Sequence, residues 1–100
     1  MAPIDVHELS ERLIDGERLN LLDVREVIEF HTYNIGGTNI PLSKVAEHTS
    51  LPGYNKTDEI IVVCRAGIRS KTACSILMKD GYPHVRNLTG GLMALQKLKY

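Results

Sequence analysis

Four branched apolar residues, Ile60-Ile61-Val62-Val63, run directly into a cysteine, and this junction restricts the fold more than any other feature of the sequence. A short continuous run of β-branched residues is typical of a strand that is buried on both faces. The loop after Cys64 contains a glycine and two arginines, and a helical pattern then extends from about Ser70 to Asp80. A buried strand that passes through a short loop into a helix predicts one unit of a parallel sheet.

The remainder of the chain repeats this alternation of strand and helix patterns. Apolar residues at helical spacing predict further helices in residues 6–16, 26–31, 42–48 and 90–99. Short apolar runs predict further strands in residues 19–24, 37–42 and 84–88, and residues 51–59 are rich in turn formers. The sequence therefore predicts an α/β fold with a mostly parallel sheet, organised as one domain over residues 1–100.

The charge balance limits the kind of partner that the chain can bind. Twelve Lys and Arg residues balance twelve Asp and Glu residues, which gives no basis for non-specific binding to nucleic acid or to an anionic membrane. Residues 1–13 carry several charges and no secretory core, and no segment approaches the roughly 20 apolar residues of a membrane span. We therefore expect a soluble, cytoplasmic protein with neither a nucleic-acid nor a membrane partner.

The two cysteines, Cys64 and Cys74, fit neither a disulfide framework nor a zinc motif at their ten-residue spacing. The four histidines are widely scattered, so we predict no metal site and no cofactor. Cys74 shares its helical pattern with Ala73 and Leu77, and we interpret it as a core residue, with a resolving cysteine as the alternative. Free thiols are typical of a reducing compartment.

The surroundings of Cys64 predict a reactive thiolate. In open α/β sheets, ligands bind beyond the carboxyl ends of the strands, where Cys64 stands. Gly67 allows backbone angles that turn successive N–H groups inward, and the start of the next helix adds positive partial charge. An ordinary cysteine is roughly 3% thiolate at pH 7, and a drop of two pKa units raises this to about three quarters. The alternative is a small buried hydrophobe at a strand end.

The segment "CRAGIRS", residues 64–70, resembles the active-site loop of the rhodanese family of sulfurtransferases, in which single-domain members often read C-R-x-G-x-R-S. Three further segments fit the family in the right order, and the resemblance covers nearly the whole chain: "LLDVRE", "IGGTNIPLS" and "NLTGGLMAL". The resemblance implies a rhodanese-like fold, in which a small central sheet is flanked by helices on both faces.

The resemblance also implies a ping-pong reaction. Cys64 would attack the outer sulfur of a small anionic donor such as thiosulfate and hold it as a persulfide, which cyanide or a thiol, including a protein thiol, would then remove. The predicted substrate-binding residues are those of the loop: Arg65, Ala66, Gly67, Ile68, Arg69 and Ser70. We expect Arg69 to have a share in bracing the loop through a salt bridge.

The family's D-x-R motif corresponds to Asp23 and Arg25, for which the resemblance implies a role in bracing the active-site loop. A plain ion pair at a strand end is the alternative. Two positions depart from the family pattern. The chain has no tryptophan after its Gly90-Gly91 pair, which we interpret as turn residues, and Asn34 stands where a histidine is common. These departures bear on the choice of substrate and acceptor.

Two other functions fit parts of the pattern. The loop of dual-specificity phosphatases reads C-x5-R, whereas the spacing from Cys64 to Arg69 is C-x4-R, which should make the ring of amides too tight for phosphate. A non-catalytic binding module or a sulfur-relay module is the second alternative, against which the intact cysteine argues.

Overall fold

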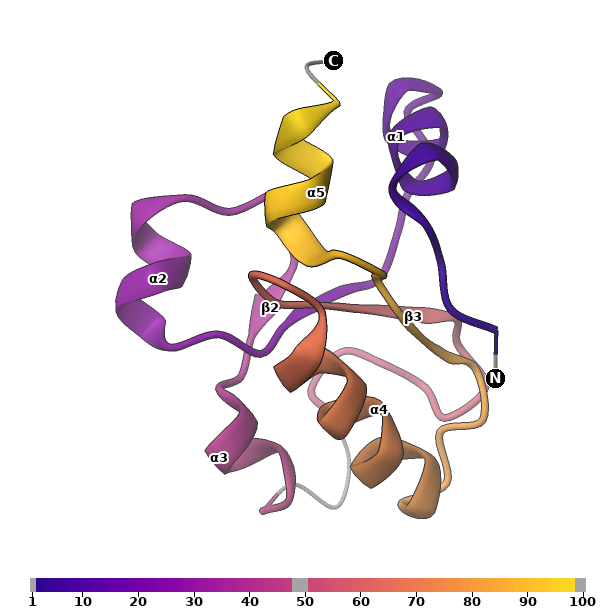
Figure 1. Ribbon diagram of the computed structural model, residues 1–100. Coiled ribbons are helices and arrows are strands. Elements are labelled where there is room, and N and C mark those ends of the chain that lie inside the picture. The colour runs from indigo at the N-terminus through magenta and orange to yellow at the C-terminus, as the bar shows by residue number, and fades with distance from the viewer. Residues whose placement is uncertain (1, 48–50, 99–100) are drawn as a thin grey trace.

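A computed structural model describes residues 2–47 and 51–98 of the chain. The described residues contain a four-stranded parallel sheet in the order β2-β1-β3-β4, and Figure 1 shows how the helices surround it. The strands are β1 (Leu21–Asp23), β2 (Thr38–Asn39), β3 (Ile60–Val63) and β4 (Val85–Asn87). The helices are α1 (Val6–Ile14), α2 (Val27–Thr32), α3 (Leu42–Val45), α4 (Ile68–Lys79) and α5 (Gly91–Lys97).

Each predicted element is present, with differences at the boundaries. β2 and α3 end earlier than predicted, at Asn39 and Val45. α4 begins at Ile68 rather than near Ser70, because Gly67 adopts a left-handed conformation and forms the N-cap. The expected ends of two helices, at His48 and Lys99, lie outside the described residues.

The side chains of β3 alternate between two hydrophobic layers. Ile61 and Val63 face a cluster that includes residues of α1 and α5, whereas Ile60, Val62 and Cys64 face a cluster that includes residues of α3 and α4. Figure 1 shows α1 and α5 together on one side of β3 and α3 and α4 on the other. The predicted α/β fold, with helices on both faces of a parallel sheet, is confirmed.

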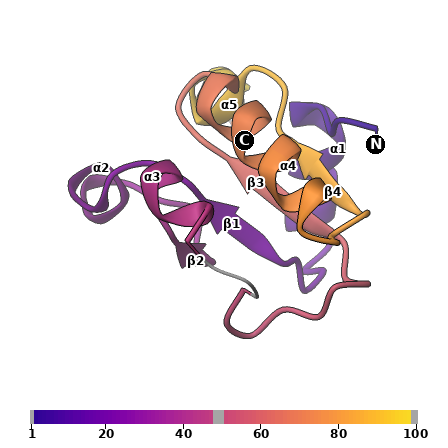
Figure 2. The ribbon, with the colours of Figure 1, turned by 90° about the horizontal axis from the view of Figure 1, so that it is seen from below.

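The carboxyl ends of the parallel strands meet at one edge of the sheet. β2 pairs with β1, β1 with β3, and β3 with β4 in continuous parallel register, so the residues that follow Asp23, Val63 and Asn87 come out at this edge. In Figure 2, α2 lies at the left-hand edge of the molecule, next to α3 in this view. Among the residues that the structure describes, no helix has the length and hydropathy to cross a membrane.

Candidate active site

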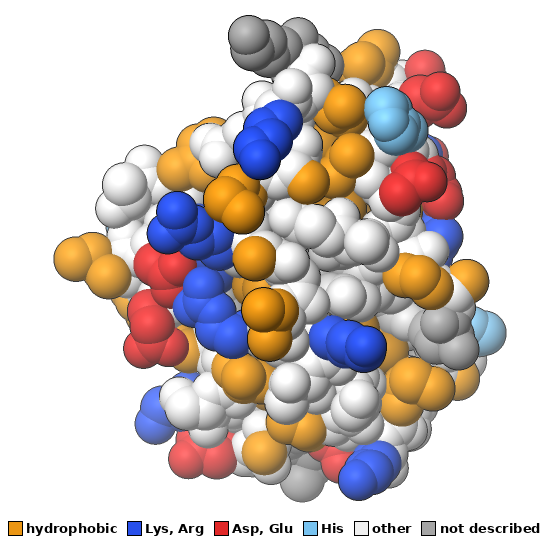
Figure 3. Space-filling view, in the orientation of Figure 1, with side chains coloured by type: hydrophobic (Ala, Val, Ile, Leu, Met, Phe, Trp, Pro, Cys, Tyr) orange, Lys and Arg blue, Asp and Glu red, His pale blue; other side chains and the backbone are white. Residues whose placement is uncertain are grey.

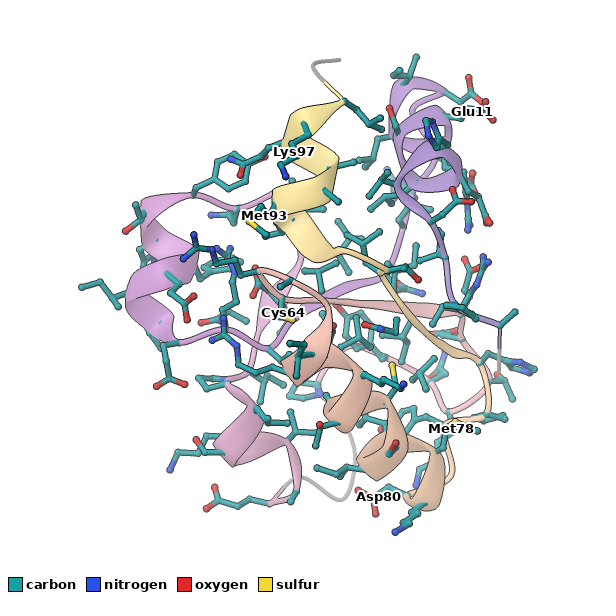
Figure 4. All side chains as sticks on the ribbon, in the orientation of Figure 1. Glu11, Cys64, Met78, Asp80, Met93 and Lys97 are labelled. Atoms are coloured by element: carbon teal, nitrogen blue, oxygen red, sulfur yellow. The ribbon has the colours of Figure 1, made fainter. Side chains whose placement is uncertain are left out.

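Cys64 follows the last residue of β3, and its sulfur lies under the start of α4. The Sγ atom accepts hydrogen bonds from the backbone N–H of Gly67 at 3.1 Å and of Ser70 at 3.3 Å, and it lies 3.2 Å from the Ser70 hydroxyl. Figure 4 shows Cys64 at the end of β3, with Met93 on the adjacent helix α5. Only 1% of the residue is exposed to solvent. The loop therefore directs backbone hydrogen-bond donors at the sulfur.

The conformation of the loop depends on Gly67. Its φ of 92° lies in the left-handed region, which L-residues rarely adopt, and a Cβ atom there would lie 3.1 Å from the Leu88 carbonyl oxygen. Ser70 is the third residue of α4, so its N–H has no partner within the helix and is free to bond the sulfur. The glycine and the early helix start together direct two amides at one atom.

Two opposing effects set the acidity of Cys64. Burial by itself raises the pKa of the thiol. Hydrogen bonds from the Ser70 hydroxyl and from the backbone N–H groups of Ser70, Gly67 and Ala66 favour the thiolate and outweigh burial, so that the pKa of Cys64 falls below its ordinary value. The site therefore favours an anionic sulfur.

The two loop arginines have different surroundings. Arg69 forms a bidentate ion pair with Glu29 of α2, with N···O distances of 2.6 and 3.0 Å, and this pair holds the pKa of Glu29 down at about 2. Within residues 2–47 and 51–98, the exposed side chain of Arg65 makes no hydrogen bond or ion pair. Figure 3 shows basic and acidic side chains together over α2 and the loop. The structure thus contains the salt bridge expected of Arg69, and sequence analysis did not identify its partner Glu29.

Asn87, at the carboxyl end of β4, is a further polar residue at this site that sequence analysis missed. Its Nδ2 atom donates to the Gly67 carbonyl at 3.2 Å, and its Oδ1 atom lies in close hydrogen-bonding contact with the Ser70 hydroxyl. Its place at a strand end was the available signal, since parallel strands bring their carboxyl ends to the same edge.

Two pockets are lined by loop residues. A groove of about 690 Å³ is bounded by Ala66, Gly67 and Ile68 together with residues of α4 and β4. A smaller pocket of about 380 Å³ is bounded by Arg65 with residues of α2 and α5. The exposed loop residues Arg65, Ala66 and Ile68 thus form walls of the two pockets, while Cys64 stays beneath them.

The sequence matches the family model for the Rhodanese-like domain over residues 5–98. The chain belongs to this family. It is 37% identical over 93 residues to a sulfurtransferase of Allochromatium vinosum, covering 91% of this chain and 84% of that protein. It is 38% identical over 81 residues to the thiosulfate sulfurtransferase PspE of Escherichia coli, covering 78% and 77% of the two chains.

Other relatives differ in length or share mainly the fold. A putative sulfur carrier protein of Bacillus subtilis, YrkF, is 33% identical over 90 residues, which cover 89% of this chain but only 48% of that protein. The rhodanese-like domain protein of Staphylococcus aureus superposes with a TM-score of 0.82 at 27% identity, over 95% of this chain and 91% of that chain. The family membership suggested by residues 64–70 is therefore confirmed.

The rhodanese D-x-R motif forms a buried ion pair at the end of β1. Asp23 accepts hydrogen bonds from the backbone and the guanidinium of Arg25, and Arg25 also donates to the Tyr33 carbonyl at 2.6 Å. Asp23 is fully buried and Arg25 is 6% exposed. The pair joins β1 to the end of α2 through the bond to Tyr33. Its link to the Cys64 loop is that Arg25 and Arg65 line the same pocket. A bracing role for this pair stays a prediction.

The glycine pair of the last motif does more than turn the chain. The N–H groups of Leu92 and Met93, which follow the pair, donate to the carbonyls of Cys64 and Arg65 at 2.9 Å each. A Cβ atom on Gly91 would lie 2.3 Å from the Arg65 carbonyl oxygen. Sequence analysis interpreted this pair as turn residues and missed that the backbone of α5 contacts the Cys64 loop directly.

Cys74 belongs to the hydrophobic cluster between the sheet and α4. It is 8% exposed, and burial raises its pKa to about 12. Both cysteines are free thiols. These properties agree with a core residue. Among the described residues, no group of three or more His, Cys, Asp or Glu side chains could hold a metal ion.

Proposed function

We propose that this chain is a sulfurtransferase that moves a sulfane sulfur through a persulfide on Cys64. The supporting observation is the sulfur of Cys64, which accepts N–H hydrogen bonds from Gly67 and Ser70 within a family whose relatives include a thiosulfate sulfurtransferase. These bonds favour the ionised form, and the thiolate is the nucleophile in reactions of cysteine.

In the first half-reaction, the Cys64 thiolate attacks the outer sulfur of thiosulfate. A new S–S bond forms, the S–S bond of the donor breaks, and sulfite leaves with the electron pair. In the second half-reaction, cyanide or a thiolate attacks the outer sulfur of the persulfide. Thiocyanate or a new persulfide leaves, and the Cys64 thiolate is regenerated. Neither step requires a cofactor.

The proposed substrate-binding residues are those of the loop, Arg65 to Ser70. Backbone N–H groups that already point at the sulfur would also stabilise the negative charge on a persulfide. The guanidinium of Arg65, which is exposed and lines the smaller pocket, would attract an anionic donor. Because Cys64 is 1% exposed, the side chains that cover it must move when the donor enters.

The test compares Cys64→Ala with the unaltered protein in a thiosulfate:cyanide assay. We expect the substitution to abolish transfer, whereas Cys74→Ser, the matched control at the second thiol, should retain most of it because Cys74 is a core residue with a raised pKa. A parallel assay with 3-mercaptopyruvate identifies the preferred donor. Substantial thiosulfate:cyanide transfer by Cys64→Ala would refute the proposal.

Mass spectrometry after thiosulfate treatment distinguishes transfer from a pure binding role. A gain of one sulfur atom on Cys64 supports the persulfide, and an unmodified Cys64 supports a binding module. A sulfur relay that depends on a partner protein would form the persulfide yet transfer slowly to cyanide.

A further inference from the structure

The side chain of Asn87 has one permitted orientation. Its neighbour on one side is the carbonyl oxygen of Gly67, 3.2 Å away, which can only accept a hydrogen bond. The amide nitrogen of Asn87 must therefore face Gly67, and the amide oxygen must face the hydroxyl of Ser70, with which it is in close contact. Because the amide oxygen can only accept, Ser70 must be the donor.

The Ser70 hydroxyl has a single proton and two neighbours that can accept it. One is Oδ1 of Asn87, and the other is the sulfur of Cys64 at 3.2 Å. When the proton is bonded to Asn87, a lone pair of the hydroxyl faces the sulfur. A protonated Cys64 can donate its S–H to that lone pair, whereas an ionised Cys64 is repelled by it. Asn87 and the Cys64 thiolate therefore compete for the same proton.

The side chain of Asn87 is neutral, unlike the charged side chains around the loop. Arg69 and the Cys74 thiol, both of α4, interact electrostatically with Cys64. The other charged groups around the loop are Arg65 in the loop itself, Glu29 of α2, and Asp23 and Arg25 at the end of β1. Arg69 and Arg25 are each paired with a carboxylate. Arg86, which precedes Asn87 on β4, pairs with Glu8 and Glu59.

We propose that Asn87 is a positioning residue that holds the Ser70 proton away from Cys64 and so limits ionisation of the nucleophile. When Cys64 ionises, its proton passes to solvent, the Ser70 hydroxyl rotates toward the sulfur, and the amide oxygen of Asn87 loses its donor. Asn87 also holds the Gly67 carbonyl, which keeps the loop in place. The inference deepens the proposed function, because it assigns the control of the same nucleophile.

The test is a titration of Cys64 by the ultraviolet absorbance of its thiolate, with the Cys64→Ser protein subtracted as background. Asn87→Leu removes the competing acceptor at similar volume and should lower the midpoint. The net worth of one hydrogen bond corresponds to a roughly three- to tenfold larger thiolate fraction below the midpoint. Asn87→Asp retains the shape, strengthens the acceptor and adds a negative charge, so it should raise the midpoint.

A role confined to holding the Gly67 carbonyl predicts the opposite sign for Asn87→Leu. A loosened loop would align the Gly67 amide less well and would raise the midpoint. A double-mutant cycle supplies the second criterion, because the effect of Asn87→Leu should vanish in a Ser70→Ala background if it acts through the hydroxyl. A higher midpoint in Asn87→Leu, or an equal shift with and without the Ser70 hydroxyl, would overturn the inference.

Asn55→Asp is the control for the added charge. Asn55 lies in the loop that precedes β3, at the opposite end of the strands, and this substitution should leave the titration unchanged. An equal shift in Asn55→Asp and Asn87→Asp would remove the support of the second variant. The titration does not depend on sulfur transfer, so failure of the inference is distinguishable from failure of the proposed function, which Cys64→Ala tests.

Discussion

Replacing Gly91 by alanine should distort the Cys64 loop without changing any of its side chains. Gly91 is the first residue of α5, and its φ of 66° lies in the left-handed region. A Cβ atom at this position would lie 2.3 Å from the Arg65 carbonyl oxygen and 2.6 Å from the Ala66 nitrogen. Both neighbours are backbone atoms, so no side-chain rotation relieves the overlap, and either the loop or α5 must move.

The expected magnitude has two parts. A left-handed conformation costs an L-residue about 1–2 kcal/mol relative to glycine. Forcing an additional methyl group into a packed region costs a further ~1–3 kcal/mol. The sum of about 2–5 kcal/mol is a large share of the total stability of a small domain, which is about 5–15 kcal/mol.

Gly16→Ala is a matched control for the backbone part. Gly16 has a φ of 75°, and a Cβ atom there would meet nothing within 4 Å. Urea unfolding of both variants should show that Gly91→Ala loses about 1–3 kcal/mol more than Gly16→Ala. The pKa of Cys64 should also rise in Gly91→Ala alone, because displacement of the loop moves the amides of Gly67 and Ser70. Equal losses in the two variants, with an unchanged Cys64 titration, would refute the reasoning.

Two further predictions concern ion pairs. In the folded state the pKa of Glu29 is about 2, below its ordinary value of 4.5, so its pair with Arg69 adds stability at pH values above 4.5 that is lost as the pH falls toward 2. Glu29→Gln should therefore lower the free energy of unfolding at pH 7 by about 1 kcal/mol, a modest value because the pair is partly exposed. Near pH 2 the variant and the unaltered protein should be equally stable. A difference in stability that is constant with pH would contradict this reasoning. Arg86→Met removes one of the two arginines that pair with Glu8 and Glu59, the other being Arg12. The resulting loss of about 1 kcal/mol should shrink in 1 M salt, whereas a salt-independent loss would indicate that packing or the hydrogen bonds of Arg86 to backbone carbonyls are responsible.

The loop around Cys64 was predictable because its parts are contiguous in the chain. Seven residues contain the strand end, the glycine and the helix start, and each has a local signal in the sequence. The start of α4 was placed two residues late because the capping conformation of Gly67 leaves no mark on the helical periodicity of the residues that follow. Local patterns specify which element is present better than they specify its first residue.

The contacts that hold the loop were not predictable in the same way. Glu29, Asn87 and Gly91 come from α2, β4 and α5, and each reaches the loop only through the packing of the fold. The side chain of Asn87 resembles an ordinary polar residue at a strand end until the strand order places it beside β3. The strand order, rather than residue type, supplied this information.

The surroundings of Arg69 bear on the choice between sulfur and phosphate chemistry. A phosphatase loop of the C-x5-R kind uses its arginine to grip phosphate oxygens, but both terminal nitrogens of Arg69 donate to the Glu29 carboxylate. The N–H groups of Gly67 and Ser70 converge on one sulfur atom, at 3.1 and 3.3 Å, rather than on the several oxygens that a phosphate presents. If Arg69 gripped a phosphate, its pair with Glu29 would have to break, whereas a second sulfur bonded to Cys64 requires no free arginine. The geometry of this loop therefore favours a single-atom cargo.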